Sequence, residues 1–194
     1  MTEKLDQLRK DFDWFRSECI KLRNTFNVYH ALYESDDEET DAALRQTACL
    51  FFHDLNDWLI QLLLLQIGRL TDPARTSGRE NLTVCWIVEE VGKVGRLIPE
   101  IDDLGAELMR YRQRNIRDVR NKYISHNDLK AFQCRQKYGQ HRKDEAYGFF
   151  ENLQKFTDEV GNAIGDGPLD YSVQAGPGDV QDLIRALKRQ VDHD

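Results

Sequence analysis

The apolar residues near the N-terminus follow a spacing that only a long helix satisfies. They alternate at intervals of three and four residues, at Leu5, Leu8, Phe12, Phe15, Cys19, Leu22, Phe26, Tyr29 and Tyr33. A repeat of about 3.5 residues places all of them on one side of a helix. The chain therefore begins with a helix whose apolar seam must be buried against other helices.

A second helix is predicted over residues 42–70. Residues 58–67 are apolar on nearly all sides, and such a helix belongs at the centre of a bundle or in a subunit interface. The acidic run before it, residues 34–41, is predicted to be a solvated loop in which Thr40 or Asp41 caps the helix. Residues 72–80 are predicted to form a loop after it.

The later helices are shorter. The predicted ranges are 82–95, with Asn81 as its cap, then 100–125, 143–164 and 179–191. Phe149, Phe150, Leu153, Phe156 and Val160 are expected to be core residues. The prediction is an all-α, up-down bundle of about five to six helices. Residues 1–165 would form the helical domain, and residues 166–194 a linker and a C-terminal helix packed on it or extending from it.

Length and charge limit the functional classes. A chain of 194 residues is long enough for one domain with a real core. A formal charge of −7 argues against non-specific coating of nucleic acid, although a local basic face can still bind RNA. The four cysteines form no zinc-ligand pattern. With no apolar leader, and with residues 59–67 too short to span a bilayer, the protein is expected to be cytoplasmic and without a membrane partner.

The helix predicted over residues 100–125 has two different faces. At about 100° per residue, one side carries Ile101, Leu104, Leu108, Tyr111, Ile116, Val119 and Tyr123. The other side carries Arg110, Arg114, Arg117 and Arg120, which either pair with acidic neighbours or bind phosphate. Arg112 falls on the apolar side, where its charge must find a carboxylate or a carbonyl.

Arg120, Asn121 and His126 stand together at the end of that helix. Arginine is a permanent, forked phosphate ligand, and histidine exchanges a proton near neutral pH. The ribose 2′-hydroxyl of RNA supplies its own nucleophile, so these groups suffice for cleavage without metal or cofactor. Arg120 and His126 are about 120° apart on an ideal helix. The helix must therefore end or bend near Ser125, or a second chain must help.

The pattern Arg120-Asn121-x4-His126 resembles the signature of the HEPN (higher eukaryotes and prokaryotes nucleotide-binding) superfamily, and the order of parts resembles its abortive-infection AbiU-type branch. The resemblance implies an all-α endoribonuclease that leaves 2′,3′-cyclic phosphate and 5′-hydroxyl ends. His126 would be the general acid/base, Arg120 the clamp on the transition-state phosphate, and Asn121 a group that orients the phosphate or the arginine. The RNA-binding residues would be Arg110, Arg114, Arg117 and Lys122.

The same resemblance implies a homodimer that acts as a toxin or antiphage effector, with a possible antitoxin or regulatory partner. The alternative is a non-catalytic HEPN-like module for interaction or for RNA or nucleotide binding. A purely structural dimeric helical protein is a third possibility. Two further Arg/His pairs, Arg23 with His30 and Arg135 with His141, fit the bare spacing but are interpreted as surface residues. Arg69 and Asp72 are interpreted as structural rather than catalytic.

Overall fold

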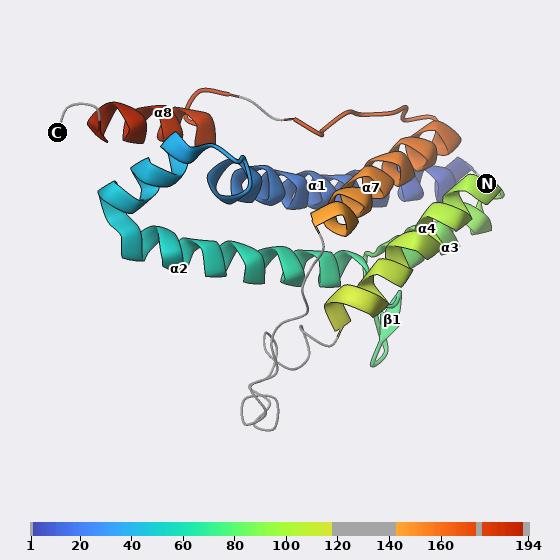
Figure 1. Cartoon of the computed structure of the whole chain (residues 1–194). Helices are drawn as coiled ribbons and strands as arrows, with labels where there is room; N and C mark the ends of the chain where they lie inside the picture. The colour runs from blue at the N-terminus through green and yellow to red at the C-terminus, as the bar shows by residue number, and fades with distance from the viewer. Residues whose placement is uncertain (1, 118–142, 174–175, 192–194) are drawn as a thin grey trace, which may run out of the picture. The chain divides into compact units, whose positions relative to one another are not determined.

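The structure is a computed structural model that describes residues 2–117, 143–173 and 176–191. Over these residues the fold is all-α, as predicted (Figure 1). The helices are α1 (Thr2–Tyr33), α2 (Glu38–Leu70), α3 (Val84–Lys93), α4 (Pro99–Tyr111), the π-helix η1 (Arg112–Ile116), α7 (Lys143–Ile164) and α8 (Val180–Val191). The strands are β1 (Arg75–Thr76) and β2 (Arg79–Glu80), which pair antiparallel.

The chain forms two compact units. The first unit contains residues 1–21 and 64–171, and the second contains residues 22–63 and 172–194. The long helices α1 and α2 each give one part to each unit, so neither unit is a continuous stretch of sequence.

The core of the first unit forms where α4 packs against α3 and α7 (Figure 1). Phe15 of α1 meets Phe156 of α7 edge to face with ring centroids 6.1 Å apart, and both side chains are fully buried. Arg9 donates from Nε and Nη2 to the carbonyl of Ile164, at 3.0 and 2.7 Å, and so satisfies the C-terminal end of α7. The five core residues predicted for this helix are confirmed, with exposures of 3% or less.

The fourth helix differs from the prediction because it changes type before it reaches residue 118. It is α-helical to Tyr111 and π-helical from Arg112 to Ile116. Leu108 and Ile116 are both buried, at 1% and 0% exposure, as expected for the apolar side of this helix. The turn at residues 112–116 is wider than an α-helical turn. The continuous α-helix over residues 100–125 was therefore wrong at residues 112–116.

Two predicted helix caps were also wrong. The cap of α2 is Asp37, whose Oδ1 accepts from the backbone N–H groups of Glu39 and Thr40 at 3.2 and 3.4 Å. The cap of α3 is Thr83, whose Oγ1 accepts from the N–H of Trp86 at 3.3 Å.

Asn81, the expected cap of α3, has another role. Its Nδ2 donates to the carbonyl of Pro73 at 2.9 Å and to Thr76 Oγ1 at 3.1 Å. It thereby closes the β1–β2 hairpin, which the sequence had indicated only as a loop.

The second unit is built around α8, the helix predicted over residues 179–191. Asp179 caps it by accepting from Gln181 N–H at 2.9 Å. The core of the second unit consists of Ala31, Leu32, Ala43, Leu44, Phe52, Ile184 and Leu187. At the edge of that core Lys188 Nζ contacts Asp37 Oδ2 at 2.6 Å. The cap of α2 is therefore also the anchor of α8.

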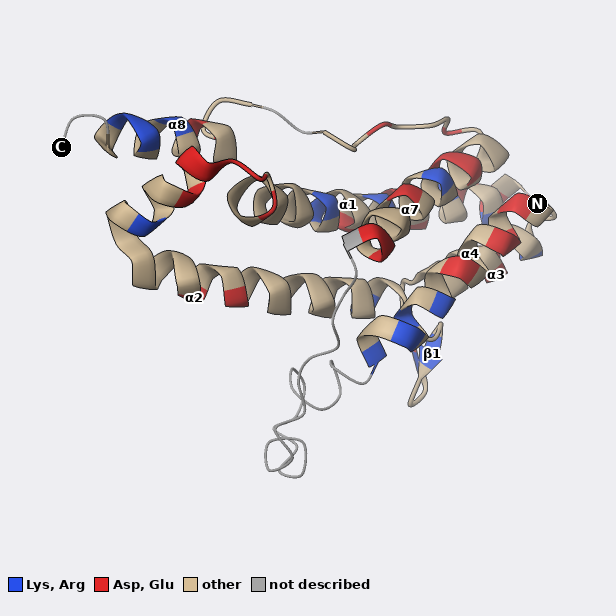
Figure 2. Cartoon of the chain, in the orientation of Figure 1, with Lys and Arg blue, Asp and Glu red and all other residues tan. Residues whose placement is uncertain are grey.

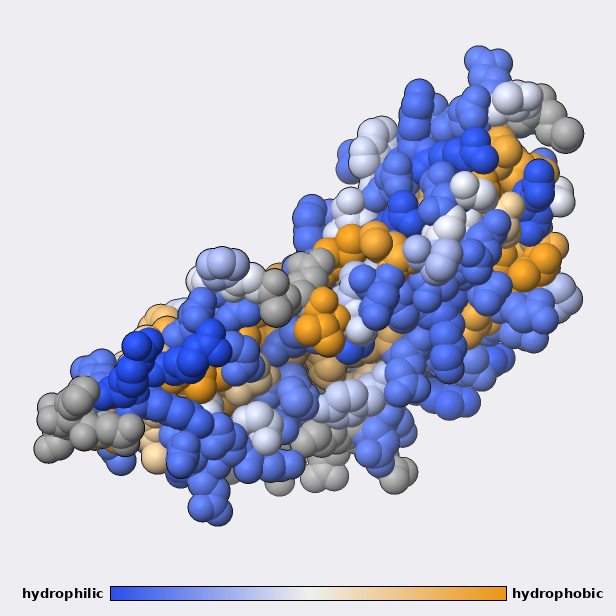
Figure 3. All heavy atoms as spheres, turned by 90° about the horizontal axis from the view of Figure 1, so that it is seen from above, coloured by the Kyte–Doolittle hydropathy of each residue, from blue (hydrophilic) through white to orange (hydrophobic). Residues whose placement is uncertain are grey.

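Several large apolar side chains of α2 are exposed. Leu50, Phe51, Trp58 and Leu62 are 81%, 52%, 56% and 41% exposed, so they do not lie at a bundle centre. Among the described helices α2 alone is long and apolar enough to cross a membrane by length and composition, and 17% of that stretch is buried. Elsewhere, on the face drawn in Figure 3, hydrophilic residues cover most of the surface and hydrophobic residues appear as separate patches.

Candidate functional site

The predicted catalytic residues Arg120, Asn121 and His126 lie outside the described residues, as does Lys122. Their convergence therefore stays a prediction. In the chain, η1 precedes the segment that carries these residues, and α7 is the next described helix after it. The segment is preceded by three of the predicted RNA-binding residues, Arg110, Arg114 and Arg117.

The charged side chains change from acidic to basic along α4 and η1. The first turns of α4 carry Glu100, Asp102, Asp103 and Glu107, and its end and η1 carry only basic charges (Figure 2). Arg110 Nη2 lies 2.6 Å from Glu107 Oε1, and this hydrogen bond holds the pKa of the Glu107 carboxyl below its ordinary value. Arg110 is therefore paired with an acidic neighbour, which is one of the two alternatives for this side of the helix; its role in RNA binding stays a prediction.

Arg114 and Arg117 are different. Both side chains are exposed, and neither forms an ion pair with any residue that the structure describes. A phosphate could bind either guanidinium without breaking an ion pair to a described residue, and a forked guanidinium suits phosphate oxygens. These two arginines remain candidates for the predicted RNA-binding residues.

Arg112 has the carboxylate partner that its position on the apolar side required. Its Nη2 lies 2.7 Å from Asp72 Oδ1, and the two side chains are only 17% and 21% exposed. Arg112 Nε is buried and has no hydrogen-bond partner among the described residues. The pair ties η1 to the turn that follows α2, so it positions the last described turns before the predicted catalytic segment.

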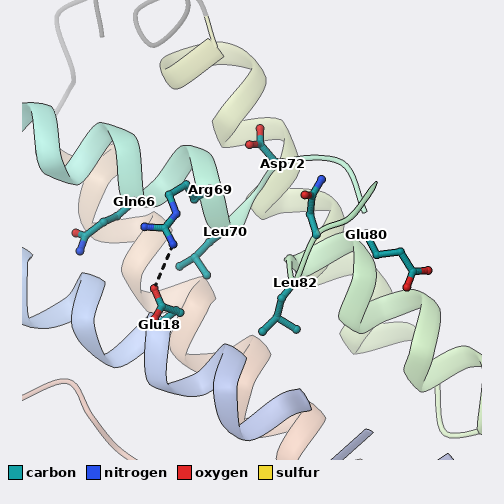
Figure 4. Close-up of a pocket in the computed structure, with 8 residues that line it drawn as sticks. Glu18, Gln66, Arg69, Leu70, Asp72, Glu80 and Leu82 are labelled. Atoms are coloured by element: carbon teal, nitrogen blue, oxygen red, sulfur yellow. Dashed lines mark ion pairs between the residues drawn. The ribbon is translucent and has the colours of Figure 1, made fainter. Parts of the chain in front are cut away.

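Arg69 and Asp72, which the sequence analysis interpreted as structural, each have an ion-pair partner other than each other. Arg69 points towards Glu18, with Nη2 3.8 Å from Oε2 (Figure 4). They line a cavity of about 360 Å³ together with Glu18, Gln66, Leu70, Glu80, Asn81 and Leu82. Three carboxylates and one guanidinium face this space, so it does not suit an RNA phosphate.

A second cavity, of about 200 Å³, lies where the end of α4 and η1 meet α7. Tyr111 and Phe149 form one wall, with ring centroids 4.7 Å apart and planes inclined by 34°. Burial raises the pKa of Tyr111 to about 12, and the negative charge of Glu145 adds to the effect. The phenol is therefore protonated at neutral pH and can donate a hydrogen bond.

Sequence reasoning missed this cavity. It assigned Tyr111 and Phe149 to helix faces, and no pattern in the sequence pairs Asn115 of η1 with Asn152 of α7, which also line it. Only the packing of the two helices brings these residues together.

The other Arg/His pairs do not form a second site among the described residues. Arg23 is half-buried and donates from Nε to the carbonyl of Ser172 at 3.0 Å and to Asn27 Oδ1 at 3.1 Å. It holds the chain after α7 and is not simply a solvated helix edge. Arg135 and His141 lie outside the described residues. The part of the chain that the structure describes has no group of three His, Cys, Asp or Glu side chains that could hold a metal ion.

Comparison with known proteins gives one match. A family model for the HEPN-type domain AbiU2 matches residues 3–183, which is nearly the whole chain. The searches of curated proteins and of solved structures each found no match.

Proposed function

Because the chain belongs to the AbiU2 family of HEPN-type domains, we propose that it is a metal-independent endoribonuclease that acts as an abortive-infection effector. The observation that carries the proposal is the sequence Arg120-Asn121-x4-His126 a few residues after η1. Arg114 in η1 and Arg117 after it are exposed and form no ion pair among the described residues. The phosphate ligands and the proton carrier would then lie on one continuous segment.

These groups account for the attack of the 2′-hydroxyl and for the charge on the phosphate. His126 removes the proton of the ribose 2′-hydroxyl, the 2′-oxygen bonds to phosphorus, and the bond from phosphorus to the 5′-oxygen breaks. Arg120 neutralises the negative charge that grows on the phosphate oxygens, and Asn121 orients the phosphate or Arg120. Arg114 and Arg117 bind flanking phosphates. The products are a 2′,3′-cyclic phosphate and a 5′-hydroxyl.

The departing 5′-oxygen needs a proton from a second acid, yet the motif supplies one histidine per chain. We therefore propose a homodimer in which two copies of the motif act together, since a two-fold axis places the same patch opposite itself. The exposed apolar residues of α2, led by Leu50, Phe51 and Trp58, support association, because large exposed apolar patches mark interaction surfaces. The proposal places the dimer in the cytoplasm under the control of an antitoxin or other regulatory partner.

A non-catalytic RNA-binding or nucleotide-binding module is the second candidate. The exposure of Arg114 and Arg117 favours it equally, because phosphate binding by these side chains does not depend on His126.

Cleavage of single-stranded RNA by the full chain separates the two candidates. His126→Ala should lower the rate by about 10²–10⁴-fold, the usual contribution of general acid/base catalysis. Arg120→Lys should also cause a severe loss, because lysine keeps the charge but not the forked geometry. Cleavage by the wild type should persist in excess EDTA and yield cyclic phosphate ends.

The matched control is His53→Ala, which removes an exposed histidine of α2 outside the motif. It should cleave like the wild type. Equal cleavage by the His126→Ala variant, or dependence on added magnesium, would contradict the proposed mechanism. RNA binding without cleavage by the wild type would favour the second candidate.

A further inference from the structure

The cavity between η1 and α7 is lined by residues that stand before and after the predicted catalytic motif in the chain. η1 ends at Ile116, α7 begins at Lys143, and the Arg120 to His126 motif lies between them in the chain. A group bound in the cavity would thus lie next to the place where the segment leaves one helix and enters the other.

The charges around the cavity do not favour a phosphate as its occupant. Glu107 and Glu145 line it together with Arg114, so the carboxylates outnumber the guanidinium. Arg114 is exposed and can hold a phosphate at the rim. A neutral group inside and an anionic group outside fit this arrangement.

The walls suit a flat, neutral group with hydrogen-bonding edges. Phe149 is 2% exposed and supports the half-buried Tyr111, which offers an aromatic surface to the cavity. Asn115 and Asn152 each carry an amide donor and an acceptor, and neither has a hydrogen-bond partner among the described residues. Proteins hold an unpaired RNA base by stacking it on aromatic rings and by forming hydrogen bonds from side chains such as amides to the edge of the base.

Gly148 keeps the space open. An ideal Cβ built on this helical glycine has no atom within 4 Å, so a side chain there would enter the cavity without a clash at its first atom. The cavity of about 200 Å³ is smaller than the pockets of roughly 300–1,000 Å³ that enclose drug-sized ligands. Its size fits one ring system rather than a whole nucleotide.

We propose that this cavity receives one unpaired nucleobase of the bound RNA, next to the phosphate that is cleaved. Asn115 and Asn152 read the edge of the base, and Arg114 holds its phosphate at the rim. The inference rests on the proposed function, to which it adds a site for base selection.

The test is binding of AMP, CMP, GMP and UMP, with ribose 5-phosphate as the probe that lacks a base. These are titrated into isotopically labelled full-length protein and followed by NMR. At least one nucleotide should bind about tenfold or more tightly than ribose 5-phosphate. Gly148→Leu should abolish this preference, and Gly148→Ala should reduce it less, in order of the volume added.

The matched control is Gly92→Leu, which puts the same side chain on an exposed helical glycine of α3 outside the cavity. It should bind like the wild type. A second variant, Asn115→Ala, guards against misfolding of the leucine variant. It should weaken binding by several-fold to about tenfold and change which base is preferred, since one edge contact is lost.

The outcomes separate this inference from the proposed function. If the wild type cleaves RNA but Gly148→Leu binds and cleaves like it, the base site is wrong and the nuclease stands. Equal binding of ribose 5-phosphate and the nucleotides would also overturn the base site. If nucleotides bind and Gly148→Leu abolishes binding while the wild type cleaves no RNA, the base site stands and the nuclease is wrong.

Discussion

The ion pair between Arg112 and Asp72 should be a main determinant of the stability of the first unit. A surface pair contributes up to about 1 kcal/mol, whereas removing one partner of a buried pair costs about 3–5 kcal/mol. The two side chains are 17% and 21% exposed, so roughly four fifths of each is covered. Asp72→Ala should therefore lower the free energy of unfolding by about 2–3 kcal/mol. Because a chain of this size loses about 2–4 °C per kcal/mol, Tm should fall by about 4–12 °C.

Thermal and urea unfolding followed by circular dichroism measure this loss. Arg69→Ala is the control, since its pair with Glu18 is longer, at 3.8 Å, and the Arg69 side chain is 64% exposed. It should cost about 1 kcal/mol or less. A double variant, Arg112→Met with Asp72→Leu, should recover most of the lost stability, because apolar residues of similar volume often replace a buried pair without cost.

An Asp72→Ala variant as stable as Arg69→Ala would refute this reasoning. It would mean that Arg112 finds water or another acceptor once Asp72 is gone. RNA cleavage by Asp72→Ala, measured well below its Tm, should also fall, because η1 would lose its tie to the turn after α2. Full cleavage would show that the pair stabilises the fold without positioning the site.

Two further predictions concern the second unit. Phe51→Ser with Trp58→Ser should convert a dimer of about twice 22.7 kDa into a monomer in sedimentation experiments; unchanged mass together with loss of binding to lipid vesicles would indicate a membrane surface instead. Lys188→Ala should speed amide exchange in α8, because Lys188 anchors this helix to Asp37. Hydrogen bonds, first the one from Lys188, lower the pKa of Asp37 from 3.8 to about 2. This contribution to stability is present above pH 3.8 and is lost as the pH falls through about 2, so exchange in the variant and the wild type should converge in that window.

Periodicity was enough to predict most helices, because each has one buried face. The bounds of α7 were predicted at both ends, since its five core residues recur at helical spacing and Gly165 follows its last turn. The cap of α2 could not be predicted in the same way. Asp37, Thr40 and Asp41 all have suitable side chains, and a lysine 151 positions away, Lys188, contacts the one that is used.

The candidate site could be predicted only in part, because contacts between residues far apart in the sequence decide it too. The position of Arg112 required a partner, but the sequence did not show that the partner is Asp72, 40 positions earlier. Likewise, the composition of α2 fitted a bundle centre and an interface equally well. The exposure of Phe51 and Trp58 decides against the first, because side chains at a bundle centre would be covered.

Neighbouring residues of η1 have different surroundings, one in the core and one at the cavity. At about 100° per residue, Asn115 lies about 20° and Ile116 about 80° from Leu108. An amide buried in the core without partners would be costly. In the structure Ile116 is fully buried and Asn115 lines the cavity beside Tyr111. The bond from Arg112 to Asp72 ties η1 to the turn after α2, and so helps to hold the turn in which Ile116 is buried and Asn115 lines the cavity.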